Sequence, residues 1–593
     1  MNQDDVAKAL LAMAESLRTQ EPPKLKMAIK CARSAVNLDT TDEQKAVSNL
    51  QLGKLLFFYT ENFELAKNHL QFAYEKMRDF GTFYSRDRMH AISMIADLYI
   101  YYQSWPVGPI KDALKREIAH TKGFPVLTNK LIFQLIEIQK IDKDVDGAFE
   151  TCQMGIQGQT DPKVELYFRI TKTLVTYQLM HEEPQNEDVL KIGSMIKALE
   201  ANPADKPHLE CVKDFFVVTK LAYMFYQGKS RTSRLLLRQI QKTSSGQDTK
   251  IQGIRWLGEG LMTLWACVMN IICALLQSNP ERVDKYYNIV VKHADEFIYK
   301  ATRTPVEPGV VRCVQMIKMT TMEMMACVNV MACRPQKTLL NVRDMFEMCA
   351  KSSGPLLYRY FAPHIQYILG LQCCYFRQHE YAEKHFIAAI QMLHPNDITA
   401  HNTAALLNLN LAMTYLNQLK MADYYEIAEK LSTHRIADCS QMLKSNVKLL
   451  TAYFSYLTNK TNECKQLVHE VLVDSKAEDF FRLHGLALLL MSLILPVDVN
   501  GVLPTVEWSK KSHDHVIIQW SHNLYERIIR AGGLENGGPE EVLRAVAEQE
   551  ESRKTLDVEH MIPLVTNMPM VKMLQWFDGD PFKLLPRDDA VLL

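Results

Sequence analysis

Residues 366–395, QYILGLQCCYFRQHEYAEKHFIAAIQMLHP, carry the pattern that decides the fold. The positions that set helix packing are occupied by Leu369, Gly370, Ala382, Phe386, Ala389 and Pro395. This is the spacing of a tetratricopeptide (TPR) unit, a hairpin of two helices called A and B. Gly370 and Ala382 have little or no side chain, so the two helices can approach closely, and Phe386 fills the remaining gap. One degenerate copy can arise by chance, so the prediction depends on recurrence.

The pattern recurs along the chain. The positions equivalent to Gly370 are Gly53, Ala96 and Ile136 in the first half, then Ala412 and Ala452 in the second. Neighbouring positions are roughly 40 residues apart, whereas a standard TPR repeats every 34. No stretch shows the sustained alternation of a half-buried strand. The sequence therefore predicts an all-α superhelical solenoid of stretched, degenerate TPR-like hairpins, in which each repeat contacts its neighbours.

Composition agrees with a large soluble array. The 593 residues contain 68 Lys plus Arg and 68 Asp plus Glu, so no global charge draws the chain toward nucleic acid or an anionic membrane. The 13 cysteines are scattered without a C-x2-C pair, which indicates reduced, buried thiols rather than disulfides or a zinc site. The most apolar run, Leu261–Leu276, is short for a membrane span. The N-terminal MNQDDVAKALLAMAESL is acidic and amphipathic, unlike a signal peptide.

Two interruptions divide the helical periodicity. One is the polar loop TSSGQDT at 243–249, and the other is the proline-rich stretch from Pro496 to Pro504. After the second, residues 508–530 are expected to be helical again, and the proline-rich last 30 residues fit either a bound tail or disorder. The expected segments are an N-terminal TPR-like array at 1–242, a continuing array at 250–495, and C-terminal helices with an irregular tail at 505–593.

Motifs for nucleotides and metals are incomplete. Gly228-Lys229-Ser230 resembles the end of a phosphate-binding loop, but Tyr223 stands where its first glycine is required. Residues 142–153, DKDVDGAFETCQ, begin like a calcium loop but end in Gln153 instead of a bidentate Glu, so a turn between helices is the better explanation. His513-x-His515 lacks a third ligand nearby. We therefore expect no enzyme activity, metal, cofactor or small-molecule substrate.

The inner wall of the superhelix is the first candidate recognition surface. Helix A of each TPR hairpin lines this wall, and counting from the landmark positions selects Leu50, Lys54, Phe57, Phe58, Asp97, Tyr101, Phe133, Glu137, Tyr367 and Tyr375. Large aromatic side chains with interspersed charges suit an extended peptide held by a few buried anchors. For each residue the alternative is packing between repeats.

A basic stripe is the second candidate surface. Arg231, Arg234 and Arg238 are three and four residues apart, which places them on one helical face together with Lys242. The stripe would suit DNA phosphates or an acidic peptide. The alternative is a solvated ridge opposite the apolar face of the same helix.

Five stretches resemble the TPR subunit of the cohesin loader, the Mau-type sister-chromatid cohesion factors. They are LQLGKLLFFYTENFELAKNHLQFAYEK (50–76), LIFQLIEIQKIDKD (131–144), ECKQLVHEVLVDSKAEDFFRL (463–483), IIQWSHNLYERIIRAGG (517–533) and WFDGDPF (576–582). The resemblance runs in order over nearly the whole chain. Its more specific parts are Ala477-Glu478-Asp479 with Arg482, and Trp520. Several repeats depart from the TPR pattern by lacking the helix B alanine, and residues 496–504 are proline-rich where the family has helix.

The resemblance implies a non-catalytic all-α superhelix that forms a heterodimer. Such proteins enclose the extended N-terminal segment of a large HEAT-repeat loader subunit of the Nipped-B type. The pair places cohesin on chromatin, which supports sister-chromatid cohesion and chromosome segregation, and family members are linked to development, including neuronal migration. The implied location is nuclear, in nucleoplasm and on chromatin, with a cytoplasmic pool also compatible. No basic import run is visible, so nuclear entry is expected to depend on the partner.

Two other classes of function stay open. One is a different TPR adaptor, such as a chaperone or transport scaffold that binds extended peptides. A carboxylate-clamp adaptor needs Lys, Asn and Arg at inner positions, where this chain has Phe58, Tyr101 and Tyr375, so the loader scaffold is favoured. The other is a solenoid that binds DNA directly through the basic stripe, which high salt would abolish.

Overall fold

The computed structural model describes most of the chain from residue 2 to residue 555. The residues not described within these limits are 103–105, 121–122, 181–183, 185, 202–205, 244–255, 258–260, 302–303, 305, 352–355, 395–399, 496 and 533–538. The predicted loop at 243–249, except its first residue, and the predicted tail, including the WFDGDPF stretch, lie outside the described residues.

The described residues form helices throughout and contain no strand. In chain order the helices are α1 (Gln3–Thr19), α2 (Leu25–Val36), α3 (Asp42–Tyr59), α4 (Phe63–Asp79), α5 (Ser85–Tyr102), α6 (Val107–His120), α7 (Pro125–Ile141), α8 (Val145–Gln157), α9 (Pro162–Val175) with a π-helical turn η1 (Thr176–Met180), α10 (Asn186–Glu200), α11 (Lys206–Gln227), α12 (Ser230–Thr243), α13 (Leu261–Leu276), α14 (Pro280–Ala301), α15 (Pro308–Met331), α16 (Pro335–Lys351), α17 (Leu356–Tyr375), α18 (His379–Met392), α19 (Ala400–Asn417), α20 (Met421–Lys430), α21 (Gln441–Leu457), α22 (Thr461–Ala477), α23 (Phe481–Ile494), α24 (Val499–Ser512), α25 (His515–Gly532) and α26 (Pro539–Thr555). The predicted all-α class is confirmed.

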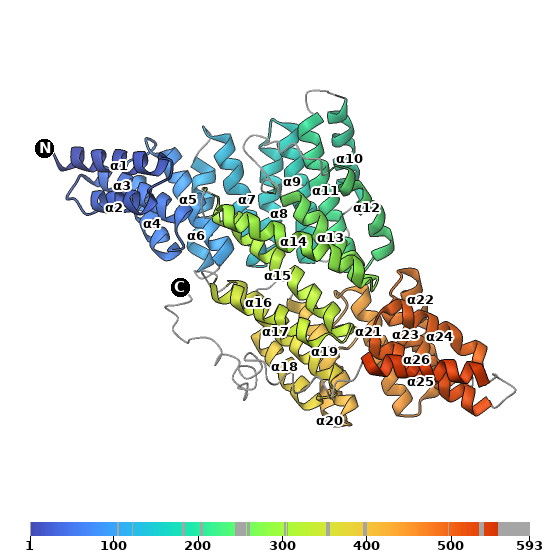
Figure 1. The fold of residues 1–593 in the computed structure, drawn as a ribbon. Coiled ribbons are helices and arrows are strands. Elements are labelled where there is room, and N and C mark those ends of the chain that lie inside the picture. The colour runs from blue at the N-terminus through green and yellow to red at the C-terminus, as the bar shows by residue number, and fades with distance from the viewer. Residues whose placement is uncertain are drawn as a thin grey trace.

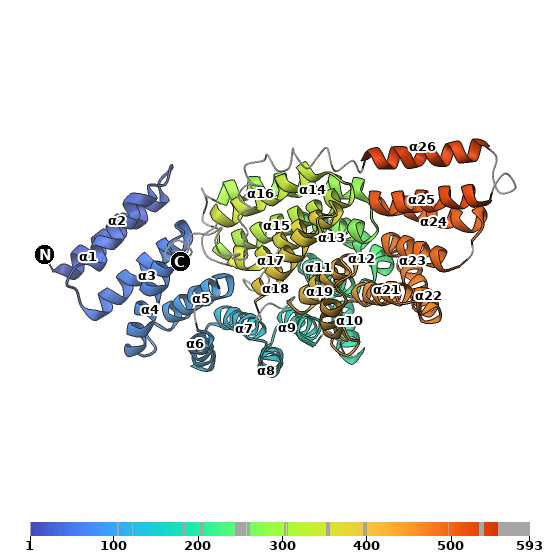
Figure 2. The same cartoon turned by 90° about the horizontal axis from the view of Figure 1, so that it is seen from below.

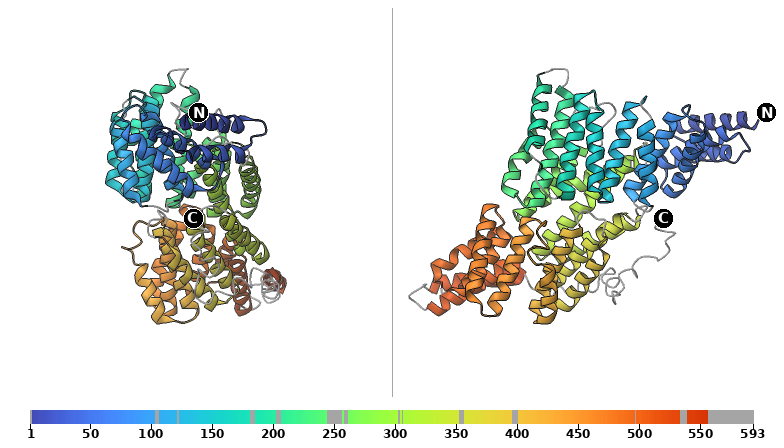
Figure 3. Two further views of the ribbon diagram at one scale, coloured as in Figure 1. Left: turned by 90° about the vertical axis from the view of Figure 1, so that its left-hand side faces the viewer. Right: turned by 180° about the vertical axis from the view of Figure 1, so that it is seen from behind.

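Consecutive helices pair into hairpins that stack into a coil with two tiers. Helices α1 to α12 make one tier, α13 to α15 cross between the tiers, and α16 to α26 make the second (Figures 1 and 3). Seen from below, α1 and α2 lie at one end and α26 at the other (Figure 2). The first tier contacts the crossing helix α15 through α5, and it contacts the second tier where the start of α12 meets the turn between α22 and α23. Successive turns of the coil therefore contact each other.

The hairpin of α17 and α18 shows why the TPR positions carry small residues. A Cβ atom added at Gly370 would lie 2.5 Å from the ring of Phe386, so the two helices meet where α17 has no side chain. Ala382, Phe386 and Ala389 are all fully buried on the other side of this contact. The hairpin of α3 and α4 repeats the arrangement, with Gly53 against Leu70. The packing predicted from the sequence is confirmed.

The C-terminal segment differs from the prediction in two places. Helix α24 starts at Val499 and continues through Pro504, so the proline-rich stretch does not interrupt the array and the predicted boundary at 505 falls inside a helix. The Asp498 side chain caps this helix by accepting from the Gly501 amide at 2.8 Å. Pro504 lies inside this helix, where its missing amide removes one backbone hydrogen bond, yet α24 continues to Ser512.

The helix predicted over 508–530 is in fact broken. His513 is left-handed, with φ of 51°, and ends α24. Asp514 then starts α25, because its carboxylate accepts from the amide of Val516 at 3.0 Å. An Asp directly before an apolar helical run is a start signal that the sequence contained.

The buried core is divided along the solenoid into separate clusters. One spans α1 to α7, a second lies around α17 to α21, and others lie between them and after them. Each cluster is made by neighbouring hairpins, as expected for an array that is stabilised mainly by nearest-neighbour contacts. None of the described helices is both long and apolar enough to cross a bilayer.

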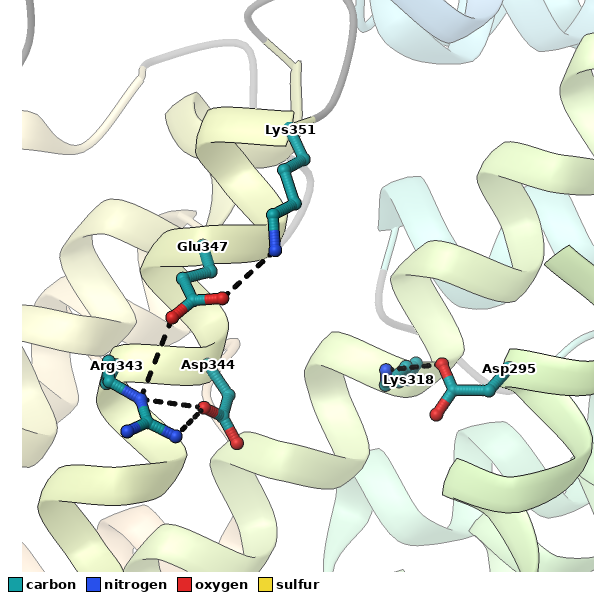
Figure 4. A network of polar contacts seen from close by, with 6 residues as sticks. All are labelled: Asp295, Lys318, Arg343, Asp344, Glu347 and Lys351. Atoms are coloured by element: carbon teal, nitrogen blue, oxygen red, sulfur yellow. Dashed lines mark hydrogen bonds and ion pairs between the residues drawn. The ribbon is translucent and has the colours of Figure 1, made fainter. Parts of the chain in front are cut away.

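Charged side chains on the outer faces make local ion pairs. On α16, Glu347 lies 3.0 Å from Lys351 and 3.7 Å from Arg343, and Arg343 also contacts Asp344 at 2.8 Å (Figure 4). These side chains are about half exposed or more, and exposed pairs of this kind each contribute at most about 1 kcal/mol. They therefore keep the surface soluble rather than hold the fold together.

Candidate partner-binding groove

A groove of about 890 Å³ lies between α1, α3 and the start of α5. Its lining combines apolar and charged side chains from Asp4, Lys8, Leu11, Ala14, Glu15, Arg18, Thr41, Glu43, Gln44, Val47, Gln51, Lys54, Leu55, Phe58, Tyr59 and Tyr84. The residues of α1 recur three or four positions apart, so one face of that helix forms one wall.

The walls of the groove are fixed by hydrogen bonds between α1 and α3. The Asp4 carboxylate accepts from the Thr41 amide at 3.0 Å and from the Thr41 hydroxyl at 2.8 Å. These bonds lower the pKa of Asp4. At the other end, Arg18 pairs with Glu15 and donates to the Tyr59 hydroxyl at 3.0 Å. Both ends of α1 are thereby held against α3.

The charge in the groove is mixed. Lys54 is 4.0 Å from Asp87, and burial lowers the pKa of this lysine. Its side chain remains 29% exposed, so the ammonium group can still contact a bound chain. Apolar contact is offered by Phe58, whose ring packs edge-on against Phe57 with centroids 4.9 Å apart. A site with an apolar floor and both signs of charge suits a polypeptide better than a small charged ligand.

Four residues of α3 were predicted to face the inside of the coil, and they divide into two pairs. Lys54 and Phe58 line the groove. Leu50 and Phe57 are only 1% and 2% exposed and belong to the core, so their predicted placement in the groove is wrong. The reason is that most of the surface of α3 is used for packing, because this helix contacts α4 closely and also contacts α2 and α1.

Asp97 and Tyr101, the next two predicted inner-wall residues, lie on α5 where α15 crosses the coil. Asp97 accepts from Gln134 at 2.5 Å and pairs with Lys130 at 3.3 Å, and Lys130 also lies 3.8 Å from Glu307. Burial raises the pKa of Asp97. The Tyr101 ring lies against Gly309, where an added Cβ would come within 2.1 Å of it. Asp97 and Tyr101 are thus engaged by the chain itself.

Phe133 and Glu137, on α7, interact with residues of α9 and of α7 itself. Phe133 stacks on Phe168 with ring centroids 4.2 Å apart and an angle of 4° between the planes. Glu137 pairs with Lys140, three residues later on the same helix, at 2.9 Å. Neither interaction reveals a partner, so contact of these two residues with another protein stays a prediction.

Tyr367 and Tyr375 lie on α17, in the second tier. The Tyr375 hydroxyl donates to Asp514 at 2.6 Å, and the same carboxylate oxygen accepts from Arg482 Nε at 2.8 Å. Tyr367 packs 6.4 Å from the ring of Phe386, and burial raises its pKa. Asp514 is fully buried and joins α17, α23 and α25 at one point.

Two partly exposed cations pair with more deeply buried carboxylates, Lys130 with Asp97 at 3.3 Å and Arg482 with Asp514 at 2.8 Å. The side chains of Lys130 and Arg482 are 40% and 43% exposed, yet burial is the largest single influence on the pKa of each. Burial lowers both values, and neighbouring acids outweigh it, so each pKa ends up raised. Both cations are therefore held by ion pairs within the chain.

The basic stripe on α12 is partly used within the molecule. Arg234 pairs with Asp479 at 2.8 Å, and the Arg231 amide donates to Glu478 at 3.1 Å. The side chains of Arg231 and Arg238 are exposed. A surface for DNA would therefore consist of these two arginines rather than the full stripe, and DNA contact stays a prediction.

A lysine from α6 pairs with two carboxylates of the calcium-like loop. Lys111 Nζ lies 2.6 Å from Asp142 and 2.9 Å from Asp144, and Asp144 also caps α8 through the Gly147 amide at 3.0 Å. The loop is the turn between α7 and α8, as the sequence indicated. Among the described residues, no three His, Cys, Asp or Glu side chains are grouped to hold a metal ion.

Comparison with known proteins gives a consistent family. The profile of the family described as "Cohesin loading factor" matches residues 6–255. The chain is 69% identical to Maternal uncoordinated protein 2 of Caenorhabditis elegans, with the full length of both chains aligned. It is 23% identical to the MAU2 chromatid cohesion factor homolog of Aedes aegypti, over 98% of this chain and 93% of that protein.

A search of solved structures finds the crystal structure of yeast Tom70. The match covers 97% of this chain and all of the other, at 11% identity and a TM-score of 0.22. A score this low carries no argument, so the fold rests on the helices described above.

Proposed function

Because this chain belongs to the cohesin loading factor family, we propose that it is the non-catalytic scaffold subunit of a cohesin loader. It would hold an extended N-terminal segment of a large HEAT-repeat subunit of the Nipped-B type as a heterodimer, and so promote cohesin loading onto chromatin. Sister-chromatid cohesion and chromosome segregation would follow from that step. Developmental roles, including neuronal migration, would be consequences of the same activity.

The observation that carries this proposal is the groove between α1, α3 and α5. Helix α3 has 18 residues and is therefore about 27 Å long, enough to run beside about eight residues of extended chain. Phe58 offers an apolar anchor, and Lys54 offers a cation that can pair with an acidic side chain or a backbone carbonyl. A segment that is disordered when free needs many such contacts, because ordering it costs free energy.

The enclosed space inside the coil would extend the binding surface beyond this groove. Lys130 on α7 and Arg482 on α23 are partly exposed cations in opposite tiers. A guest chain that entered between α1 and α3 would meet these cations further along. A long wrap of this kind fits a stable heterodimer better than brief peptide capture by a chaperone or transport adaptor, which is the alternative function.

The test replaces the two groove residues and leaves the core intact. We expect Lys54→Glu combined with Phe58→Glu to weaken binding of the loader subunit's N-terminal segment at least tenfold, measured by calorimetry with the full chain. Phe57 is kept, because truncating a buried Phe costs about 3–5 kcal/mol of stability and would confuse the result.

The matched control is Phe72→Glu on α4, where the native side chain is already 38% exposed and lies outside the groove. It should bind like the wild type. Unchanged affinity of the double variant, with its melting temperature preserved, would remove this groove from the interface.

We expect the protein to be nuclear and chromatin-associated when its partner is present. The proposed dependence on the partner is tested by imaging the chain with and without the large subunit. Nuclear accumulation of the chain alone would contradict it.

A further inference from the structure

The turn between α11 and α12 contacts a part of the chain more than 200 residues away. The Tyr226 hydroxyl donates to the backbone carbonyl of Asp438 at 2.8 Å, across 212 residues of sequence. The Ser230 hydroxyl donates to the backbone carbonyl of Glu478 at 2.6 Å, across 248 residues. These bonds join the first tier to the second.

An ion pair and one close apolar contact complete this junction. Arg234 Nη2 lies 2.8 Å from Asp479 Oδ2. Gly228 has φ of 80° and a Cβ added to it would lie 3.3 Å from the Phe480 ring and 3.4 Å from Met442. Asp479 is left-handed as well, with φ of 58°. Each side of the junction is thus a tight turn shaped to meet the other.

Apart from the contact of Gly228 with Phe480 and Met442, the junction is polar, whereas the helices on either side of it pack through apolar clusters. On one side α11 to α13 bury a cluster that includes Leu221 and Leu237, and on the other α21 to α23 bury a cluster that includes Val468 and Leu483. The two clusters are separate. Arg234 and Asp479 keep 39% and 23% of their side-chain surface exposed. A partly exposed ion pair and a few hydrogen bonds hold far less strongly than a shared apolar core.

The position of this weak junction matters because it closes the coil. From α12 the chain runs through α13 to α20 and returns to the junction at α21 to α23, so the intervening helices form a loop that the junction seals (Figures 1 and 3). Parting the two turns would open the loop and uncover one side of Phe480, which belongs to the cluster of α21 to α23, whereas the cluster of α11 to α13 has no member in the junction.

We propose that this junction is a latch, formed by Tyr226, Gly228, Ser230, Arg231 and Arg234 against Asp438, Met442, Glu478, Asp479 and Phe480, and that its opening admits a partner polypeptide to the inside of the coil. The identity of the guest rests on the proposed function, but the opening of the latch does not. Threading a long chain end-first through a closed coil is slow, and a side entrance removes that requirement.

The first experiment measures the latch in the isolated full-length chain by amide hydrogen exchange. Arg234→Asp should speed exchange at least fivefold in the first turn of α12 and in residues 477–481. The double swap of Arg234→Asp with Asp479→Arg should bring it back to within twofold of the wild type. Asp479→Asn is the conservative variant, because asparagine tolerates the left-handed conformation and only the charge is lost. It should also speed exchange.

The amides of α3 and α4 serve as the internal control and should not change. Exchange that is the same in Arg234→Asp, Asp479→Asn and the wild type would show that the pair does not hold the junction, and would overturn the latch. If Asp479→Asn loses amide protection at the junction but the double swap does not restore it, the loss of protection does not arise from the Arg234–Asp479 ion pair.

The second experiment measures how fast the N-terminal segment of the large loader subunit associates with each full-length variant. Arg234→Asp and Asp479→Asn should associate three- to tenfold faster than the wild type, and the double swap should return to the wild-type rate. Faster exchange with an unchanged association rate would overturn the entrance. No binding by any form would reject both the proposed function and the entrance, while the exchange data still decide whether the latch opens.

Discussion

At Gly370, the absence of a side chain decides how closely α17 and α18 approach. An added methyl group would meet the Phe386 ring at 2.5 Å, inside a fully packed contact. We expect Gly370→Ala to lower the free energy of unfolding by about 1–3 kcal/mol, the usual cost of overpacking a core. Chemical denaturation followed by circular dichroism measures it. Gly193→Ala is the control, because nothing lies within 4 Å of its Cβ position and alanine favours the helix. Equal stabilities of the two variants would contradict this packing.

His484 gives the stability a dependence on pH. The ring is buried against Trp508 and bonded to the Ser475 hydroxyl at 2.9 Å, and burial, with Lys476 nearby, lowers the pKa of His484 to about 4 from 6.5. Between these values the unfolded chain binds the proton and the folded chain does not. The stabilisation is therefore complete above pH 6.5 and is lost as the pH falls toward 4, by roughly 3 kcal/mol at this site.

The measurement is urea denaturation at a series of pH values. Between pH 6.5 and 4, His484→Gln should lose less stability than the wild type, whereas a control variant at the exposed His434 should follow the wild-type curve. A steeper loss in His484→Gln than in the wild type would reverse the sign and refute the assignment.

At the scale of elements, the turns between paired helices share one unusual backbone conformation. Left-handed residues other than glycine stand at Lys143, Ser278, Cys333, Arg377, Leu419, Asn459, Asp479 and His513, each just after a helix. A left-handed conformation costs about 1–2 kcal/mol for most residues with a side chain and little for Asn. The turns therefore carry a local cost that the packing of the hairpins offsets.

Leu419 shows how this cost can be removed. It has φ of 57° and is 72% exposed, so glycine at this position would lose little buried surface. We expect Leu419→Gly to raise the free energy of unfolding by about 0.5–1 kcal/mol, after the greater freedom of glycine in the unfolded chain is subtracted. Asn459→Gly, at φ of 61°, should gain almost nothing. Thermal denaturation distinguishes the two, and a destabilised Leu419→Gly would disprove the argument.

The sequence predicted elements well where local chemistry decides them. The hairpin of α17 and α18 follows from Gly370 and Phe386, because small and large residues at TPR spacing are a local pattern. The break at His513 was missed because a left-handed residue that is neither Gly nor Asn is not recognised from its residue type, although Asp514 was a helix start signal that could have indicated it. Pro504 was overrated as an interruption, because α24 continues through it despite the backbone hydrogen bond that a proline removes.

At the scale of the whole molecule, separate cores imply that distant regions open independently. Gly53→Ala places a methyl group 2.8 Å from Leu70 in the first cluster, and Gly370→Ala disturbs the contact with Phe386 in the second tier. We expect each variant to speed amide exchange only within about one or two hairpins of its site. Each variant is the control for the other. Equal acceleration throughout the chain in both would show one cooperative unit instead.

The sequence predicted only part of the candidate groove, because its pattern reports contacts within one hairpin and not contacts between distant hairpins. Counting along helix A found Lys54 and Phe58, because their position depends on one hairpin. It could not show that α15 covers Asp97 and Tyr101, since Tyr101 and Gly309 are far apart in the sequence and meet only when the coil completes a turn. The wall that α1 contributes, from Lys8 to Arg18, could have been predicted, because its residues recur at three- and four-residue spacing along the helix.

The junction between Ser230 and Glu478 also sets an order of events during synthesis. The two residues are 248 positions apart, and ribosomes add about 5–20 residues per second, so Ser230 emerges roughly 10–50 s before the residue that covers it. During that interval the first tier has emerged from the ribosome, but the second tier that contacts it has not. A partner protein that bound the first tier during that interval would be enclosed when the second tier folds. Such a complex would form more easily during synthesis than from two finished chains.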